Sequence, residues 1–406
     1  MTERPRPLRI LMLAPEPFFE PRGTPFSEFH RIKALVELGH HVYLVTYPFG
    51  VDIDLPNLRI IRSPRPPFVR RVRVGPSLLK VVLDGLLVIT AMRVAREGRY
   101  DVVHSHEEAG FFGTWLSRRI GVPHVYDMHS SLPQQLSNFR HALGRWLRPW
   151  FERLERRTLQ ESQAVITICQ ELQDQVTASG VGERSVLIEN VMGGSTDDPP
   201  SISAADVRAM WGLSPKQPVA LYTVTFESYQ GVDLLTDAAS RLRKTHPAAV
   251  VLVVGGESAQ VDAARAHARL VDAPVVFTGQ QPAREIPAYV AAADILVSPR
   301  VAGTNTPLKL YSYLASGKPI VATDLRTHTQ VLDRTTALLV PPDAESVAAG
   351  IARLVDDPSL GRRLADNAAT VSRARYSRET YIARVERAYE LLRTPRSSTP
   401  RECSHG

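Results

Sequence analysis

The stretch Ile295–Thr323, ILVSPRVAGTNTPLKLYSYLASGKPIVAT, decides the fold. It begins and ends with short apolar runs, Ile295–Pro299 and Ile320–Thr323, and residues 306–316 between them have a helical pattern. This order is typical of neighbouring parallel strands joined by a crossover helix. Because both apolar runs are nearly continuous, the strands are expected to be buried on both faces. The stretch therefore predicts a parallel sheet with helices over both of its faces.

The same alternation runs along most of the chain. Strands are predicted in the first half at Arg9–Ala14, His41–Thr46, Leu58–Ile61, Val102–His104, His124–Asp127, Ala164–Ile168 and Val186–Ile188. They are predicted in the second half at Val219–Val224, Val250–Val254, Val275–Thr278, Ile295–Pro299, Ile320–Thr323 and Leu338–Val340. Since 406 residues exceed the roughly 100–200 usual for one domain, we predict an α/β chain of two Rossmann-like, doubly wound parallel-sheet domains.

A break in this alternation between Gly193 and Ala204 marks the domain boundary. The segment contains turn-forming residues but no apolar periodicity, which is typical of a linker. The expected organisation is an N-terminal domain over 1–192, a linker over 193–204, a C-terminal domain over 205–375, a final helix over 376–392 and a disordered tail over 393–406.

One helix of the first domain can be predicted in detail. Phe26–Leu38 has apolar residues on one stripe, and Gly39 follows it where a left-handed C-cap residue belongs. The pattern predicts a helix that packs on the core and ends at Gly39.

Composition narrows the class of protein. The formal net charge of +7 would suit phosphorylated substrates or an anionic membrane surface, and charge alone does not exclude nucleic acid. The two cysteines, Cys169 and Cys403, are poor material for a disulfide and fit a reducing cytosol. The apolar run at Leu78–Met92 contains Lys80 and Asp84 and is shorter than the ~20 residues of a spanning helix. We therefore expect a cytoplasmic protein.

Two loops that follow strands have the design of an anion site, and ligands of open α/β sheets bind at the carboxyl ends of strands. They are Arg22–Pro25, after the first strand, and Gly303–Lys309, after the strand that ends at Pro299. In each, a threonine is placed to cap a helix and a proline to occupy its first position, which leaves backbone N–H groups free for phosphate. The alternative is an ordinary, well-capped helix. Lys309 and Arg300 would add charged donors to the second loop.

Two common nucleotide-binding motifs are missing. No Gly-x-Gly-x-x-Gly follows any predicted strand, and Gly255-Gly256 lacks the third glycine. A Gly-Lys-Ser/Thr loop is also absent. These absences argue against a dehydrogenase and a P-loop NTPase.

The chain resembles glycosyltransferase family 4, whose members have the GT-B fold, from Arg9 to about Leu392. The strongest match is PLKLYSYLASGKPIVAT at Pro307–Thr323. Others are Ile10–Pro15 with its Gly23 loop, Asp101–His106 (DVVHSH), Tyr126–His129 (YDMH), Val165–Gly180, Leu221–Ala238, Val275–Pro299 and Leu339–Pro342 (LVPP).

The resemblance implies two domains facing across a cleft and a C-terminal helix that returns to the first domain. It also implies transfer of a sugar from a nucleotide-diphosphate donor, a UDP- or GDP-sugar, with retention of anomeric configuration. The donor would bind mainly to the C-terminal domain and the acceptor to the N-terminal one. The expected acceptor is a glycan, lipid-linked or small-molecule compound of cell-envelope or polysaccharide biosynthesis. No nucleic acid and no cofactor are expected.

Site residues carry over from the family one by one. Gly23 would let the backbone approach the donor, and His129 matches a histidine that touches the transferred sugar. With Arg300 and Lys309, His129 is expected to stabilise charge during the reaction. The donor-binding set is Gly23, Thr24, Thr225, Gln230, Gly231, Gly303, Thr304, Asn305, Thr306, Leu308 and Ser312.

The chain departs from the family where the donor diphosphate is held. The family has an Arg and a Lys after the first strand of the second domain, and here Thr225 and Gln230 replace them, with only Gly231 kept. Thr304 and Ser312 replace two glutamates that hold sugar and ribose hydroxyls. Either Arg300, Lys309 and the Thr306 helix terminus compensate, which we favour, or the chain is a catalytically silent GT-B subunit that binds nucleotide or a partner. A GT-B epimerase or phosphorylase would also keep the fold.

No carboxylate stands out as a nucleophile, so the family mechanism would be a same-face displacement. No Asp-x-Asp metal motif is evident, and we predict that the enzyme is metal-independent. Arg140–Arg157 alternates arginines with Trp146, Trp150 and other apolar residues, as in a helix lying on an anionic membrane. Such a helix can equally be an ordinary cover of the sheet. The membrane reading would place the protein at the inner face of the membrane.

Overall fold

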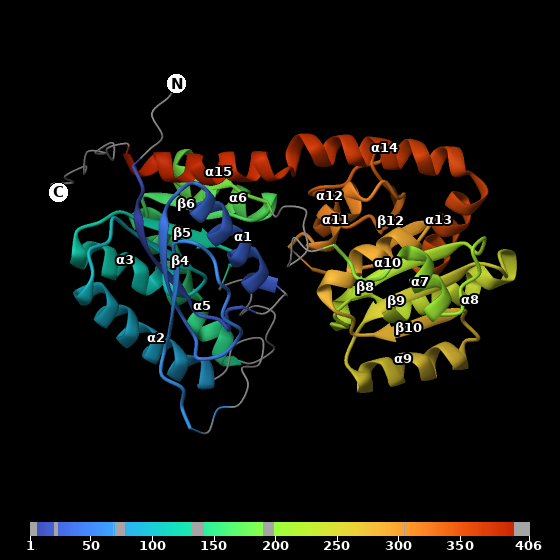
Figure 1. Cartoon of the computed structure of the whole chain (residues 1–406), viewed down its shortest axis with the longest axis horizontal. Helices are drawn as coiled ribbons and strands as arrows, with labels where there is room; N and C mark the ends of the chain where they lie inside the picture. Colours follow the sequence, from blue (N-terminus) through green and yellow to red (C-terminus); the bar gives the residue numbers. More distant parts are fainter. Residues whose placement is uncertain are drawn as a thin grey trace. The chain divides into compact units, whose positions relative to one another are not determined.

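A computed structural model describes residues 6–19, 23–67, 69, 78–131, 142–189, 199–303 and 305–393. The chain divides into two compact units, residues 1–189 with 381–406 and residues 190–380. Each unit has one parallel sheet with helices on both of its faces (Figure 1). Residues 193–198 of the predicted linker and all of the tail beyond Arg393 lie outside the described residues.

The first unit has a seven-stranded sheet in the order β3-β2-β1-β4-β5-β6-β7, and all of its pairings are parallel. Its strands are β1 (Arg9–Ala14), β2 (His41–Thr46), β3 (Leu58–Arg62), β4 (Val102–His106), β5 (His124–Met128), β6 (Ala164–Thr167) and β7 (Ser185–Leu187). The strand order reverses between β1 and β4, which opens a crevice at their carboxyl ends where ligands of such sheets bind.

Helices cover both faces of this sheet. Leu11 and Leu13 of β1 face one layer, where they pack with α2 and α3. The helices of the unit are α1 (Gly23–Glu37), α2 (Leu78–Glu97), α3 (Ala109–Ile120), α5 (Ala142–Glu161), α6 (Gln170–Val176) and α15 (Arg378–Glu390), which belongs to this unit from Tyr381 onward.

The second unit repeats the design with six strands in the order β10-β9-β8-β11-β12-β13. The strands are β8 (Val219–Val224), β9 (Val250–Gly255), β10 (Val275–Gly279), β11 (Ile295–Ser298), β12 (Ile320–Thr323) and β13 (Leu338–Val340). The helices are α7 (Ala204–Met210), α8 (Val232–Thr245), α9 (Ser258–Leu270), α10 (Ile286–Ala292), α11 (Lys309–Ala315), α12 (Arg326–Thr329), α13 (Ala344–Asp356) and α14 (Pro358–Arg375). The order reverses between β8 and β11.

Both units confirm the predicted parallel sheets and their buried strands. Successive β8 residues alternate between two cores, so that Tyr222 packs with α8 and α13 while Leu221 packs with α10 and α11. The predicted end of the first helix is also confirmed. Gly39 has φ 87° and donates its N–H to Val36 O at 2.9 Å.

The two predicted threonine caps are wrong. The α1 helix begins at Gly23, so Thr24 lies in its first turn. The α11 helix begins at Lys309, and its cap residue is Leu308, which makes no side-chain cap bond. The N–H of Leu310 reaches back only three residues, to Pro307 O at 3.0 Å, so the chain makes a tight turn before the helix starts.

The length and hydropathy of the helices bear on membrane insertion. Among the residues that the structure describes, no helix is long and apolar enough to cross a bilayer.

Candidate active site

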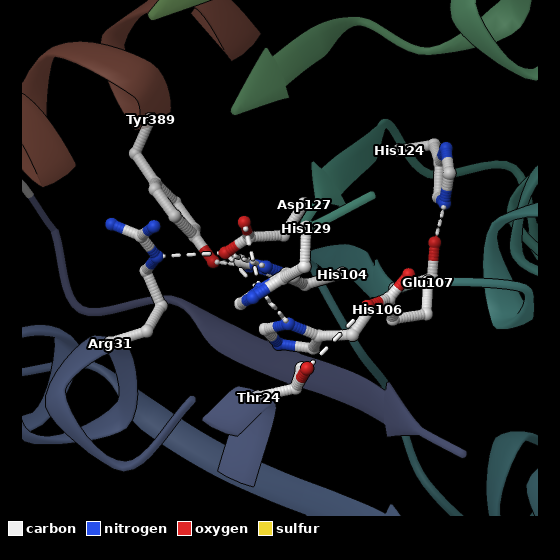
Figure 2. Close-up of polar contacts among 10 residues, drawn as sticks. Thr24, Arg31, His104, His106, Glu107, His124, Asp127, His129 and Tyr389 are labelled. Carbon is white, nitrogen blue, oxygen red and sulfur yellow. Dashed lines mark hydrogen bonds and ion pairs between the residues drawn. The ribbon is translucent and has the colours of Figure 1, made fainter. Parts of the chain in front are cut away.

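The carboxyl ends of β4 and β5 bring four polar side chains together. Parallel pairing sets His106 of β4 opposite Asp127 of β5. Residues two apart on a strand share a face, so His104 lies beside His106 and His129 beside Asp127. All four are buried, and Figure 2 shows their side chains converging next to Arg31 of α1.

Asp127 is the centre of this cluster. Its Oδ2 lies 2.8 Å from Arg31 Nε, 3.5 Å from His104 Nε2 and 3.8 Å from His106 Nδ1. Its Oδ1 lies 3.2 Å from His129 Nε2. Burial opposes the charge of the carboxyl, but the charges of Arg31 and His129 hold the pKa of Asp127 well below its usual range. Asp127 is therefore a carboxylate.

The three histidines around Asp127 differ in charge. Burial lowers the pKa of His104, and that of His106 well below its usual value, so both are neutral near pH 7. Burial also opposes the charge of His129, but the neighbouring Asp127 carboxylate outweighs it and raises the His129 pKa. The cluster thus places one ring that readily becomes imidazolium among two neutral ones.

Helix α15 contacts the cluster through two tyrosines. The hydroxyl of Tyr389 lies 2.7 Å from His104 Nδ1, and both groups are buried. The guanidinium of Arg31 lies 5.2 Å from the ring centroid of Tyr381, in the range of a cation–π contact.

Two carboxyl groups lie near the histidines, Glu107 directly after β4 and Glu28 on α1. Glu107, which has φ 49°, accepts hydrogen bonds from Ser130 Oγ at 2.6 Å and Thr24 Oγ1 at 3.5 Å. Burial raises the pKa of Glu28 to about 7. These oxygens are acceptors of the kind that bind sugar hydroxyls.

His104, His106 and Asp127 are also residue types that bind metal ions, with ligating atoms within 4.8 Å of one another. However, Arg31 already contacts the same Asp127 oxygen that a cation would need. A divalent cation there would lie beside the buried guanidinium, and like charges at that distance repel strongly. The cluster does not fit a metal centre, because Arg31 supplies the positive charge.

In the second unit, the predicted donor residues after β8 form a rigid loop. Gln230 accepts a hydrogen bond from Thr225 N at 3.1 Å and donates one to Thr225 Oγ1 at 2.9 Å. Gly231 has φ 73°, and a Cβ there would lie 2.0 Å from Pro299 O. Only glycine fits this position, and the side chain of Gln230 is used to brace the loop.

Arg300 and Lys309 meet at the switch point between β8 and β11. Arg300 Nη1 donates to Asn305 O and to Thr327 Oγ1, each at 3.1 Å. Lys309 Nζ donates to Thr223 O and lies 4.2 Å from the ring centroid of Tyr222. Burial, together with the charge of Arg300, holds the pKa of Lys309 well below its usual value.

The other predicted donor residues lie at several separate places in the fold. Gly303 has φ 125° and is exposed, Leu308 precedes α11, and Ser312 lies exposed on α11. Thr306 is buried, and its hydroxyl has no hydrogen-bond partner in the described part of the chain. Thr304 lies outside the described residues, and Gly23 opens α1 in the first unit.

A hollow of about 470 Å³ lies at the carboxyl ends of β9 and β10. Its lining includes Gly256, Glu257, Ser258, Arg265 and Thr278. The signal in the sequence that could have indicated this hollow is Gly255-Gly256 at the end of β9.

Family models match both units. Residues 30–190 match the model described as Glycosyl transferase 4-like domain, and residues 217–357 match that described as Glycosyl transferases group 1. With two parallel-sheet units, these matches define the protein as a glycosyltransferase of the GT-B fold. The chain belongs to glycosyltransferase family 4, as the resemblance implied.

Similar proteins include two with curated activities. Phosphatidyl-myo-inositol mannosyltransferase of Mycobacterium leprae is 26% identical over 398 residues, 95% of this chain and 98% of that protein. Alpha-D-kanosaminyltransferase of Streptomyces kanamyceticus is 26% identical over 290 residues, 68% of this chain and 73% of that protein.

Solved structures agree on the fold. Sucrose-phosphate synthase from Thermosynechococcus elongatus aligns with a TM-score of 0.75 at 21% identity, over 95% of this chain and 99% of that one. Anabaena HepE in complex with UDP aligns with a TM-score of 0.73 at 17% identity, over 94% of this chain and 100% of that one.

Sequence reasoning found His129 but missed the groups around it. His104 with His106 and Asp127 with His129 are two polar i, i+2 pairs at the ends of adjacent buried strands, and that pattern could have indicated a shared face. Nothing in the sequence indicates that Arg31, on a helix far earlier in the chain, contacts Asp127.

We expect Arg31→Met to destabilise the protein by about 3–5 kcal/mol, because it leaves the Asp127 carboxylate buried without its cation. Urea unfolding would measure this loss. The matched control is Arg148→Met, which breaks an exposed pair with Glu152 and should cost less than about 1 kcal/mol. Equal losses in the two variants would contradict the central role of the buried pair.

Proposed function

We propose that this glycosyltransferase moves a sugar from a UDP- or GDP-sugar to a hydroxyl of a glycan, lipid-linked or small-molecule acceptor, with retention of configuration. The observation that carries the proposal is the pair of basic side chains Arg300 and Lys309 at the switch point of the second unit. They lie beside the loop 225–231 in which the family's arginine and lysine are replaced. A bound diphosphate would favour the charged form of Lys309, which burial opposes.

The hollow at the ends of β9 and β10 supports the same placement of the donor. It adjoins β8, since β9 pairs with β8 and β10 with β9. A nucleotide whose diphosphate reaches Lys309 could place its base there. We therefore assign the base to the hollow and the diphosphate to the loop.

In the proposed transfer reaction, negative charge develops on the donor phosphate as it leaves the sugar. In a same-face displacement the bond from the anomeric carbon of the sugar to the donor phosphate oxygen breaks, and the acceptor oxygen forms a bond to that carbon on the same face. The departing phosphate oxygen takes the proton of the acceptor hydroxyl. Arg300, Lys309 and the imidazolium of His129 are the groups we assign to stabilise this phosphate. No metal is assigned to the reaction, since Arg31 supplies the charge in the histidine cluster.

A silent nucleotide-binding subunit is the competing function. The replaced arginine and lysine support it, as does Gln230, whose side chain braces its own loop. The two functions differ in whether the donor is consumed.

We expect the protein to release UDP or GDP from a matching nucleotide sugar when an acceptor is present, and to do so in excess chelator. The measurement is nucleotide release over a panel of donors and acceptors, with NMR of the product to assign its anomeric configuration. A product with retained configuration supports the proposal. Binding of a donor without release would instead indicate the silent subunit, and an inverted product would rule out retention.

Lys309→Ala should weaken nucleotide-sugar binding at least roughly tenfold, because a hydrogen bond to a charged group contributes about 1.5–3 kcal/mol. His129→Ala should lower kcat more than affinity. Isothermal titration with UDP, GDP and their sugars measures both variants. Lys318→Ala, which removes an exposed cation just beyond α11, is the matched control and should bind normally. Weaker binding by His129→Ala than by Lys309→Ala would mean that the diphosphate is misplaced.

We further propose that α3 and α5 contact an anionic membrane, where lipid-linked acceptors would be found. Trp115 of α3 is 44% exposed and Trp150 of α5 is 54% exposed. A chain of ring contacts joins the two helices, from Trp150 through Phe151 to Phe111, with centroids 4.9 and 6.5 Å apart. Exposed aromatic side chains of this kind are typical of surfaces that lie at the membrane interface.

Cations border this aromatic surface. Arg153 and Arg156 of α5 and Arg119 of α3 are exposed. The described residues include no carboxylate in an ion pair with any of the three. Side chains of residues 142–147, including the predicted Trp146, are not described. An anionic headgroup layer fits the arginines, and its interface fits the tryptophans.

Vesicles that contain acidic phospholipid should sediment with the protein at low salt and release it at high salt, where the Debye length falls to about 3 Å at 1 M. The double variant Arg153→Glu/Arg156→Glu should bind at least roughly tenfold more weakly, since each cation near the surface contributes about 1 kcal/mol. Arg362→Glu/Arg363→Glu makes the same charge change on α14 and should bind like the unchanged protein. An equal loss of vesicle binding in both double variants would show that only the net charge of the protein matters, and would contradict the proposed membrane surface.

A further inference from the structure

We propose that Asp127 is a positioning residue that orients His129 and keeps it charged, and that Tyr389 of α15 holds the opposite side of the same network through His104. This inference rests on the proposed role of His129 in the transfer reaction. It extends that role to residues on three other elements.

The contacts define a continuous chain of polar groups. Tyr389 Oη lies 2.7 Å from His104 Nδ1, and His104 Nε2 lies 3.5 Å from Asp127 Oδ2. The other carboxylate oxygen, Oδ1, lies 3.2 Å from His129 Nε2. Asp127 therefore contacts His104 with one oxygen and His129 with the other, as Figure 2 shows.

The proton positions along these contacts can be assigned from the charges of the groups. We assign the tyrosine hydroxyl as the donor to His104 Nδ1, because the His104 proton then lies on Nε2, facing the Asp127 carboxylate. With His129 as an imidazolium, both of its nitrogens carry protons, so its Nε2 is the donor to His106 Nδ1, 3.2 Å away. His129 then carries a proton on Nε2 that faces both Asp127 and His106.

Among the described residues, charged or titratable groups surround His129 from three elements. From β5 comes Asp127, from β4 and the residue after it come His104, His106 and Glu107, and from α1 come Arg31 and Glu28. Asp127 and Glu107 favour the imidazolium, while Arg31 opposes it. Asp127 is the carboxylate in direct contact, so its removal is the change that His129 should feel most.

The contact of Arg31 with Asp127 does not by itself explain the arrangement. Arg31 Nε reaches Oδ2 only, and one cation is sufficient to balance one buried carboxylate. The second oxygen is directed at His129 instead. That division is typical of a carboxylate that orients a histidine, whose tautomer is set by the bond at its other nitrogen.

Helix α15 contacts this network through the hydroxyl of Tyr389. The hydroxyl of Tyr389 is buried against His104, so the last helix of the chain touches the group that contacts Asp127. Removing the hydroxyl alone should release the tautomer of His104 while leaving the aromatic ring in the core.

The test is nitrogen-15 NMR of the full-length protein labelled at histidine, with the His129 signal assigned by its loss in His129→Gln. His129 should titrate above its ordinary value of about 6.5 in the unchanged protein. In Asp127→Asn it should titrate lower by about one unit or more, because an opposite charge within roughly 4–6 Å shifts a pKa by about 1–3 units. An unshifted His129 in folded Asp127→Asn would overturn the proposal.

Tyr389→Phe tests the proposed contact between Tyr389 and His104. It also gives a result if Asp127→Asn does not fold. Its His104 signal should change from the single Nε2–H tautomer to a mixture, whereas Tyr289→Phe, which removes a buried hydroxyl that accepts from Trp211, should leave it unchanged. A His104 signal that is identical in Tyr389→Phe and the unchanged protein would refute the role of α15.

Activity then separates this inference from the proposed function. If His129 acts as an imidazolium, the rate should fall as the pH rises through its pKa, and in Asp127→Asn this fall should move to lower pH by the shift measured by NMR. An NMR shift without any movement of the rate profile would contradict the role of His129 in transfer while upholding the contact with Asp127.

Discussion

The buried contact between Arg31 and Asp127 is the interaction on which the centre of the first unit depends. Either charge alone would be costly to bury, since removing one partner of such a pair costs about 3–5 kcal/mol. The pair joins α1, which follows β1, to β5, and it therefore spans the switch point between β1 and β4. Three histidines surround this carboxylate, and of these His129 shares with Arg31 the role of favouring its charge.

In the second unit, by contrast, two basic side chains contact neutral groups. Arg300 and Lys309 are held by carbonyl oxygens, a hydroxyl and aromatic faces. Neither has an ion pair with a carboxylate among the described residues. Burial opposes the charge of both side chains, and Glu227 is a carboxylate that favours it. An anion bound beside them would favour their charged forms further. The same fold thus contains one buried ion pair and one pair of basic groups without an ion pair among the described residues.

The fold could be predicted from sequence because its strands are short, nearly continuous apolar runs at regular intervals, and each of them became a strand of a parallel sheet. The helix starts could not, because Thr24 and Thr306 match a cap pattern that the local turns override. The site divided similarly. Arg300 and Lys309 were predicted from a loop that follows a strand and His129 from the family resemblance, whereas the Arg31 contact depends on the rotation of α1 over the sheet, which no local pattern encodes.

The corrected start of α11 changes which group must hold the donor phosphate. A helix of seven residues has few aligned peptide dipoles, and its first residue is Lys309 itself. Because no threonine caps α11, side-chain charge is expected to supply most of the attraction for the proposed donor phosphate. Lys309 and Arg300 come from the ends of α11 and β11, whereas the family's two cations follow the first strand of the domain. On the proposed placement of the donor, positive charge at the switch point comes from the ends of β11 and α11 instead of the end of β8, and the switch point is common to both arrangements.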